Sequence, residues 1–420
     1  MLKRSLFLVT LLGLPFESLA QEQKEFQADL RTFYFNGERD DRQNREALAV
    51  GGILKYTSPQ INKLRASAAF YGSYNLLNTT QLDTLRVKNG STVTDSSDIA
   101  GNSELVQSDG SSISVLGEAY IEYDNFNTLV RIGRQRLNTP LLNDYYNRFL
   151  PNSFEAALLE NSSLAQTKIS LAVVNRWKYK ADEEFRSMGG TLAENKKLFF
   201  AGLQNRSLQN ISLEGWFYRL DDAFDSYYFK SSYEKQNFIS DLKLSTAVHY
   251  LKQDESGDML LGNLDTYLFG TKISLQSEKL TLTCMADKVG KDTIRGSGTD
   301  YRDLGFSKFV NFTDIQIDGE ALNAGAFSYG AVVGYKFSPK YKAALKYVHI
   351  DQDTQKQLNS YTPNKRADSD EYNIDMRYKT SKTSQVRVRL AQIDYASNPS
   401  ITNEYDEINL RIIYDYRFKI

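Results

Sequence analysis

The feature that most restricts how this chain can fold is a series of long segments in which apolar and polar residues alternate. The segment at 405–418 has apolar side chains on one face and polar side chains on the other: Leu410, Ile412, Tyr414, Tyr416 and Phe418 against Glu407, Asn409, Arg411, Asp415 and Arg417. Because successive side chains of a strand point to opposite faces, each such strand separates two different surroundings. Alternating segments of about ten residues are typical of strands that cross an outer membrane.

This alternation predicts eighteen strands, an even number as in bacterial single-chain barrels. They lie at 26–36, 47–57, 64–75, 112–124, 127–136, 154–162, 166–177, 197–206, 209–220, 225–234, 239–252, 264–276, 279–288, 325–338, 341–351, 370–380, 383–395 and 405–418. In a bilayer, every backbone polar group must be hydrogen-bonded internally, which a closed antiparallel barrel achieves. The predicted fold class is therefore an all-β transmembrane barrel.

The links between these strands alternate in length. Short links lie at 58–62, 125–126, 163–165, 207–208, 234–237, 277–278, 339–340 and 381–382. The links between them include 76–111, 137–153, 178–196, 289–324 and 352–369, and among these intervening links only 221–224 is also short. Short periplasmic turns and long extracellular loops are typical of a membrane barrel, whereas strands of a soluble β-sandwich usually have about five or six residues. The link lengths favour the barrel.

The N-terminus predicts export. Residues 1–20 combine a charged start at Lys3 and Arg4, an apolar run and a small-residue cleavage site ending at Ala20, which is typical of a signal peptide. Residues 21–420 contain no linker and are predicted to form one barrel domain. Cys284, the single cysteine, has no partner for an internal disulfide. The 51 Lys and Arg residues nearly balance the 52 Asp and Glu residues, so no nucleic-acid surface is indicated.

Residues 130–155 read VRIGRQRLNTPLLNDYYNRFLPNSFE. This stretch resembles the OprD family of outer-membrane porins, and the matching residues are Gly133, Gln135, Thr139, Pro140, Asn143, Asp144, Arg148, Leu150, Pro151, Phe154 and Glu155. The resemblance implies an eighteen-stranded channel, monomeric or trimeric, whose third extracellular loop folds into the lumen and whose wall carries a track of basic residues for carboxylate solutes. The chain departs from the family in having Ala156 and Ala157 where glycine is common, and in placing Lys419 and Ile420 after the aromatic Phe418.

The segment 137–153 is the candidate constriction of the pore. Its candidate residues put two charges and two bulky rings on a short loop: Asn143, Asp144, Tyr145, Tyr146 and Arg148. A pore acquires selectivity from a narrow place and the charges that line it. The alternative is an external surface loop with a proline turn.

A second candidate feature is a pore-lining basic ladder. The alternation assigns to the lumen Arg131, Lys342, Lys346, Arg377, Lys379, Arg387, Arg389 and Arg411. Guanidinium groups bind carboxylates in a bidentate manner, so a column of them is expected to guide anionic solutes. The alternative is that these cations solvate the lumen and pair with Asp375, Glu407 and Asp415.

These features predict a porin of the Gram-negative outer membrane for small polar or anionic solutes such as carboxylates, amino acids or peptides. No catalytic residue, cofactor or metal is expected, because His249 and His349 are the only histidines and have no partner at metal-ligand spacing. The alternatives are an adhesive or structural barrel acting through 76–111 and 289–324 and, with less support, a barrel hydrolase. Expected partners are outer-membrane lipid, lipopolysaccharide and the barrel assembly machinery.

Overall fold

The structure is a computed structural model. It describes residues 25–39, 45–78, 86–88, 91–93, 104–107, 110–190, 193–260, 264–290, 310–314, 316–317, 322–323, 325–353, 367–396 and 406–419. The predicted signal peptide, 1–20, lies outside these ranges and remains a prediction. Among the described residues, no helix is long and apolar enough to cross a bilayer.

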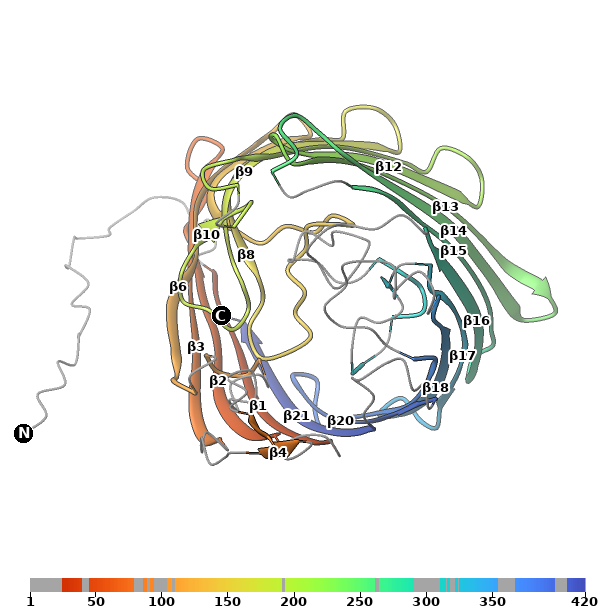
Figure 1. Ribbon diagram of the computed structural model, residues 1–420. Coiled ribbons are helices and arrows are strands. Elements are labelled where there is room, and N and C mark those ends of the chain that lie inside the picture. Colours follow the sequence, from red (N-terminus) through yellow and green to blue (C-terminus); the bar gives the residue numbers. More distant parts are fainter. Residues whose placement is uncertain are drawn as a thin grey trace, which may run out of the picture.

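Eighteen long strands in the described part of the chain form one closed antiparallel barrel (Figure 1). They are β1 (Glu25–Arg39), β2 (Arg45–Thr57), β3 (Leu64–Asn78), β6 (Ile113–Asn125), β7 (Thr128–Gln135), β8 (Ser153–Asn161), β9 (Thr167–Lys178), β11 (Leu198–Asn205), β12 (Ile211–Leu220), β13 (Phe224–Ile239), β14 (Leu242–Glu255), β15 (Asp265–Gln276), β16 (Leu280–Val289), β17 (Phe327–Lys336), β18 (Tyr341–Asp351), β19 (Ser369–Lys379), β20 (Ser384–Tyr395) and β21 (Glu407–Lys419). Each pairs with its neighbours in the chain, and β1 pairs with β21. The predicted fold class is confirmed.

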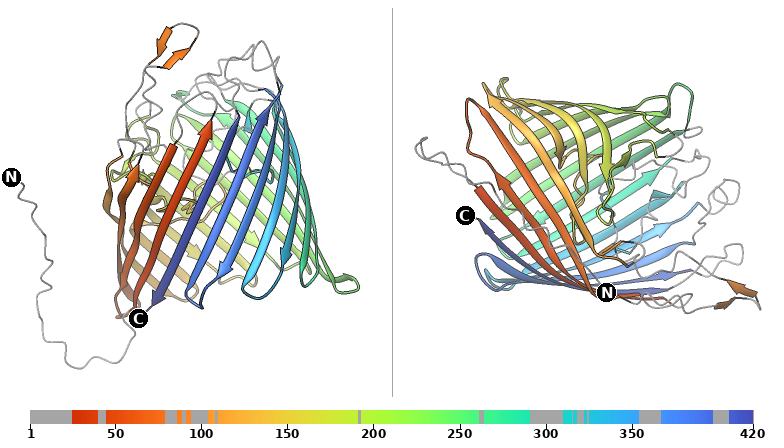
Figure 2. Two further views of the ribbon diagram at one scale, coloured as in Figure 1. Left: turned by 90° about the horizontal axis from the view of Figure 1, so that it is seen from below. Right: turned by 90° about the vertical axis from the view of Figure 1, so that its left-hand side faces the viewer.

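Three short strands stand apart from this series. The strand β10 (Arg186–Ser187) pairs with the end of β9, and β4 (Arg86–Lys88) pairs with β5 (Ser91–Val93) in a separate hairpin. Figure 2 shows that hairpin beyond one end of the barrel. This is the extracellular end, because the links at the opposite end are the short turns expected on the periplasmic side.

The two faces of each strand lie in different surroundings, as the alternation predicts. In β21, Ile408 and Ile412 are exposed on the outer surface, whereas Asn409 and Arg411 are buried on the inner one. Apolar side chains left exposed in such a continuous band match a lipid environment. The same parity fixes which side chains of the other strands reach the lumen.

One predicted turn is wrong. The short link expected at 234–237 lies inside β13, which continues to Ile239 and turns at 240–241. The register slips between Lys235 and Ile239, so the strand continues through an irregularity instead of ending there. The resulting β13–β14 hairpin extends beyond its neighbours at the periplasmic rim (Figure 2).

Candidate functional site

The motif that ends β7 is built around close backbone packing. Gly133 has a φ of +128°, and a Cβ there would lie 2.2 Å from the carbonyl oxygen of Ala119, so a side chain cannot be accommodated. Two residues later, the Gln135 side chain is fully buried and donates to the Ala156 carbonyl at 2.9 Å. These contacts set the direction in which the chain leaves β7.

Beyond β7, local side-chain hydrogen bonds turn the segment 137–153. The Thr139 hydroxyl donates to the Leu142 carbonyl at 2.9 Å and accepts from the Leu142 amide at 3.0 Å. The Asn143 side-chain oxygen accepts from the Tyr145 amide at 3.0 Å, and Tyr145 has a φ of +36°. Asn and Thr stabilise turns in this way because their short side chains reach nearby backbone groups. The path is therefore encoded within the segment itself.

The first part of this segment packs on the inner wall at β11 and β12. Leu137, Leu141 and Leu142 are buried in an apolar cluster that includes Phe200 and Tyr218 from those strands. Three apolar side chains removed from water contribute roughly 1.5–3 kcal/mol each, so apolar burial is the main attachment here.

The second part packs on another region of the wall. Phe149 and Leu150 are buried with Phe33 and Phe35 of β1. Close by, the Arg31 guanidinium donates to the Arg148 carbonyl. The segment is thus attached both to β11–β12 and to β1, and it runs through the interior of the barrel (Figure 1).

A buried ionic cluster holds the segment at Arg148. Its guanidinium lies 2.7 Å from the Glu104 carboxylate, and Lys180 Nζ lies 2.8 Å from the same carboxylate. Lys180 also donates to the Asn147 side chain at 3.0 Å and lies 4.3 Å from the centre of the Tyr145 ring. Burial opposes the charge on both partners, but Lys180 and Arg148 together still lower the pKa of Glu104. Burial lowers the pKa of Lys180 to about 8 despite Glu104.

The remaining charged and aromatic groups of the segment also have partners. Asp144 lies 3.4 Å from Arg136, and the Arg31 guanidinium lies 4.4 Å from the centre of the Tyr146 ring. Burial raises the pKa of Asp144, and Arg136 partly offsets that rise. Of the five predicted constriction residues, Asn143 lines the cavity described below, and the other four pack against neighbouring charges inside the barrel.

A second interior segment, described at 310–314 and 316–317 and referred to below as 310–317, was not recognised in the sequence, where 289–324 was treated as one long loop. Phe312 stacks on His249 at 4.2 Å between ring centres, and His249 Nε2 lies 3.0 Å from Asp287. The backbone amide and hydroxyl of Thr313 donate to Asp287 at 2.7 and 2.8 Å. The signal that could have revealed this segment is a concentration of apolar residues at 309–317, namely Phe309, Val310, Phe312, Ile315 and Ile317.

The end of this second segment is fastened to the wall on the other side. The amide of Gln316 donates to the Glu371 carboxylate at 2.6 Å, and its carbonyl accepts from Arg411 at 2.8 Å. Arg411 is only 1% exposed and also donates to Asn409 at 2.8 Å. This member of the predicted ladder therefore anchors a segment and is not an open pore-lining cation.

Between the two segments and the wall lies a cavity of ≈ 640 Å³. Asn138, Asn143 and Asp314 line it from the segments, and the wall contributes three cations: Lys230, Lys272 and Lys346. Lys230 is 3.0 Å from Glu214. The cavity is thus water-accessible, polar and bordered by several amines, one of them the predicted Lys346.

The predicted basic residues of β18 to β20 do lie together. Lys342 is opposite Arg377, which is opposite Arg387, so these three share the inner face. Three guanidiniums surround one carboxylate, that of Asp375: Arg377 at 3.1 Å, Arg389 at 3.7 Å, and Arg387 in direct contact. The cluster carries more positive than negative charge.

Arg131, assigned to the same ladder, lies apart from it on β7. Its guanidinium contacts the buried Glu122 carboxylate, which also contacts Arg65. Strands β1, β2, β3 and β6 separate β7 from β21. The structure therefore does not bring Arg131 together with the arginines around Asp375.

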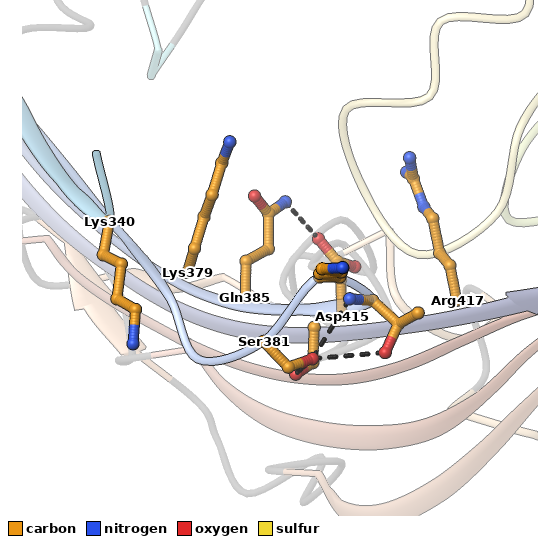
Figure 3. Close-up of a pocket in the computed structure, with 9 residues that line it drawn as sticks. Lys340, Lys379, Ser381, Gln385, Asp415 and Arg417 are labelled. Carbon is orange, nitrogen blue, oxygen red and sulfur yellow. Dashed lines mark hydrogen bonds between the residues drawn. The ribbon is translucent and has the colours of Figure 1, made fainter.

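A second cavity, of ≈ 650 Å³, opens at the periplasmic mouth below the arginine cluster. Figure 3 shows Lys379, Gln385 and Arg417 pointing to the same side, while Lys340 points the opposite way. Gln385 donates to Asp415 at 3.0 Å, and Asp415 also pairs with Arg31 at 2.6 Å. Lys379 continues the positive inner wall from Arg377 to the mouth.

Residues 21–420 match the profile of the OprD family, described as outer membrane porin. The chain belongs to the OprD family of outer-membrane porins. Its place is accordingly the bacterial outer membrane. No curated protein sequence matches it closely enough to count as a relative.

Solved structures similar to this OprD-family porin share its fold at low sequence identity. They include OccK1 (OpdK) of Pseudomonas aeruginosa, with a TM-score of 0.70 and 16% identity over 95% of this chain and 99% of that one. OccK8 (OprE) of the same species has a TM-score of 0.73 and 17% identity over the same shares. OccAB3 of Acinetobacter baumannii has a TM-score of 0.76 and 14% identity over 94% and 99% of the two chains.

Proposed function

We propose that this OprD-family porin passes small polar or anionic solutes such as carboxylates, amino acids or peptides by passive diffusion, with a preference for anions. The segment 137–153, with Asn143, Asp144, Tyr145, Tyr146 and Arg148, would narrow the pore, and the second segment, 310–317, would narrow it from the opposite wall. The proposal rests on two segments that pack inside the barrel and on the polar cavity between them. A pore of this kind works without a catalytic group or cofactor, as monomer or homotrimer.

The observation that carries the anion preference is the arginine cluster at Asp375. Three guanidiniums face one carboxylate, which leaves the inner wall net positive at this level. Towards the periplasm the wall continues with Lys342 and Lys379. Same-face positions of a strand are about 7 Å apart, so a carboxylate can move from one cation to the next without leaving the wall.

One of the similar solved structures, OpdK, was determined with vanillate. Vanillate is an aromatic carboxylate, the class of solute that a guanidinium cluster binds in a bidentate manner. Binding to such a cluster must remain weak enough for release, and Asp375 serves this purpose by competing with the solute for Arg387.

The experiment is a measurement of reversal potential for the protein in a planar bilayer with asymmetric KCl. In the double variant Arg387→Gln/Arg389→Gln, we expect the anion-to-cation permeability ratio to fall severalfold. The reason is that only Arg377 then remains beside Asp375, so the cluster loses its excess of positive charge. In Asp375→Asn, we expect the ratio to rise, because three guanidiniums lose their internal partner.

The control is Lys279→Gln, which removes one cation from a periplasmic turn away from the cluster. Heat-dependent electrophoretic mobility confirms that each variant is a folded barrel. An unchanged ratio in both the double variant and Asp375→Asn would refute an anion preference based on this cluster.

A further inference from the structure

The outer wall of the barrel carries a depression of ≈ 530 Å³ at β6 to β9. Its floor is Ala157, which lies in register between Ile132 and Val173. Both neighbours are well exposed, Ile132 at 60% and Val173 at 42%. A small side chain between two large ones leaves a gap in the otherwise apolar outer surface.

A polar row borders this depression on its extracellular side. One register step above Ile132, Arg134 lies opposite Glu155, and Glu155 lies opposite Arg176. Asn175 is the extra residue of a β-bulge and is exposed beside them. Lys197, just before β11, completes the row. Because β7 and β9 run toward the extracellular end here, the row marks the extracellular edge of the exposed apolar surface at Ile132 and Val173, where lipid headgroups are expected.

The cations of this row are incompletely neutralised. Arg134 pairs with Glu155 at 3.0 Å and covers the Phe185 ring at 4.2 Å. In the described part of the chain, Arg176 and Lys197 are exposed and have no carboxylate partner. The carboxylate of Glu183, in the link that follows β9, accepts a hydrogen bond from the backbone amide of Ser114.

Two other outward-facing cations near the extracellular rim are paired with carboxylates. Arg219, at the extracellular end of β12, lies 2.6 Å from Asp225. Lys252, near the extracellular end of β14, lies 2.9 Å from Asp254 and also contacts Asp265. The cations around the depression are thus less neutralised than these two.

We propose that this wall binds a phosphorylated, multiply acylated glycolipid of the outer leaflet, of the lipopolysaccharide class. A phosphate lies between Arg176 and Lys197, and an acyl chain fills the depression over Ala157. Arginine and lysine bind phosphate through charge-assisted hydrogen bonds, and cations at a membrane surface attract anionic lipids. The site lies outside the lumen, so it is independent of the pore function proposed above.

Binding of diphosphorylated, hexa-acylated lipid A to the folded barrel in detergent, followed by native mass spectrometry, tests the site. We expect Arg176→Gln/Lys197→Gln to weaken binding by about tenfold or more, since two surface cations are lost. The matched control, Arg219→Gln/Lys252→Gln, removes the same charge from paired positions at the same rim and is expected to bind as the wild type does. The wild type is expected to have a low affinity for dephosphorylated lipid A. That affinity should equal the affinity of the Arg176→Gln/Lys197→Gln variant for phosphorylated lipid A.

A second variant separates the acyl chain from the phosphate. Ala157→Trp fills the depression without changing any charge, and we expect it to weaken binding while single-channel conductance stays at the wild-type value. Equal binding by the wild type and the Arg176/Lys197 variant, or equal binding of both forms of lipid A, would overturn the proposal. The proposal would also be overturned if the wild type formed an oligomer and the Ala157→Trp variant were monomeric. A second copy of the chain would then be the occupant of the depression.

Discussion

At the scale of single residues, Lys180 is a buried amine whose charge changes just above neutral pH. Its side chain is 1% exposed and touches Glu104, Asn147 and Tyr145, so it joins the segment 104–107 to the segment 137–153. Burial lowers its pKa to about 8, and Glu104 partly offsets the fall. Small increases in pH above neutrality therefore remove a charge whose burial opposes packing of the interior segment.

We expect raising the pH from 7 to 9 to decrease fluctuations of the single-channel current, because burial lowers the pKa of Lys180 to about 8 and loss of the proton therefore favours the packed position of its side chain over release. The unfolded chain keeps the lysine proton to about pH 10.4, so this group's contribution to the free energy of unfolding increases with pH and the barrel itself is not weakened. In the Lys180→Met variant, the fluctuations of the single-channel current should be equal at both pH values. The same pH dependence in Lys180→Met would assign the effect to another group.

At the scale of elements, the two interior segments are attached by different forces. Apolar burial of Leu141 and Phe149, together with the ion pair of Arg148, holds 137–153, whereas carboxylates of the wall hold 310–317 through its backbone amides. Hydrogen bonds to a charged group contribute roughly 1.5–3 kcal/mol each. The second segment is therefore expected to respond to the loss of a single charge.

We expect Asp287→Asn to loosen 310–317, because the amide keeps the shape of the side chain but loses the charge that accepts from Thr313 and contacts His249. The expected cost is on the order of 2 kcal/mol, and the readout is a higher mean conductance with more frequent substates. Asp265→Asn, which changes an exposed carboxylate on the outer surface, serves as the control. A conductance identical to that of the wild type would show that the segment does not restrict the pore.

At the scale of the whole molecule, stability depends on closure between β1 and β21. The two strands pair along thirteen positions, from Gln27 opposite Lys419 to Arg39 opposite Glu407. Phe26 and Phe418 lie 6.1 Å apart between ring centres at this seam. Closure leaves no strand edge with unpaired backbone groups, which a bilayer would not tolerate.

We expect Phe418→Ala to lower the amount of folded porin in the outer membrane severalfold, because the aromatic residue near the C-terminus packs at the seam and is the group expected to be read by the barrel assembly machinery. Deleting Ile420 alone should leave the amount unchanged. The measurement is the fraction of heat-modifiable protein in isolated outer membranes. Equal amounts for Phe418→Ala and the wild type would remove Phe418 from the assembly signal.

The sequence by itself determined the number of strands, their order and the face on which each side chain lies. These follow from a period of two residues and from the difference between lipid and water, which are local properties of each strand. The inward placement of Arg377, Arg387 and Arg389 was predictable for that reason. The length of β13 was not, because an irregularity in pairing lets the strand continue past residues that favour a turn.

Only the tertiary structure decided which inward charges remain available. Arg131 is neutralised by Glu122 from the neighbouring strand, and Arg411 is occupied by Gln316, which is 95 positions away in the chain. The placement of 310–317 inside the barrel depends in the same way on Asp287 and Glu371 reaching its backbone. Closure of the barrel creates these contacts between distant parts of the chain, and alternation along a strand carries no information about them.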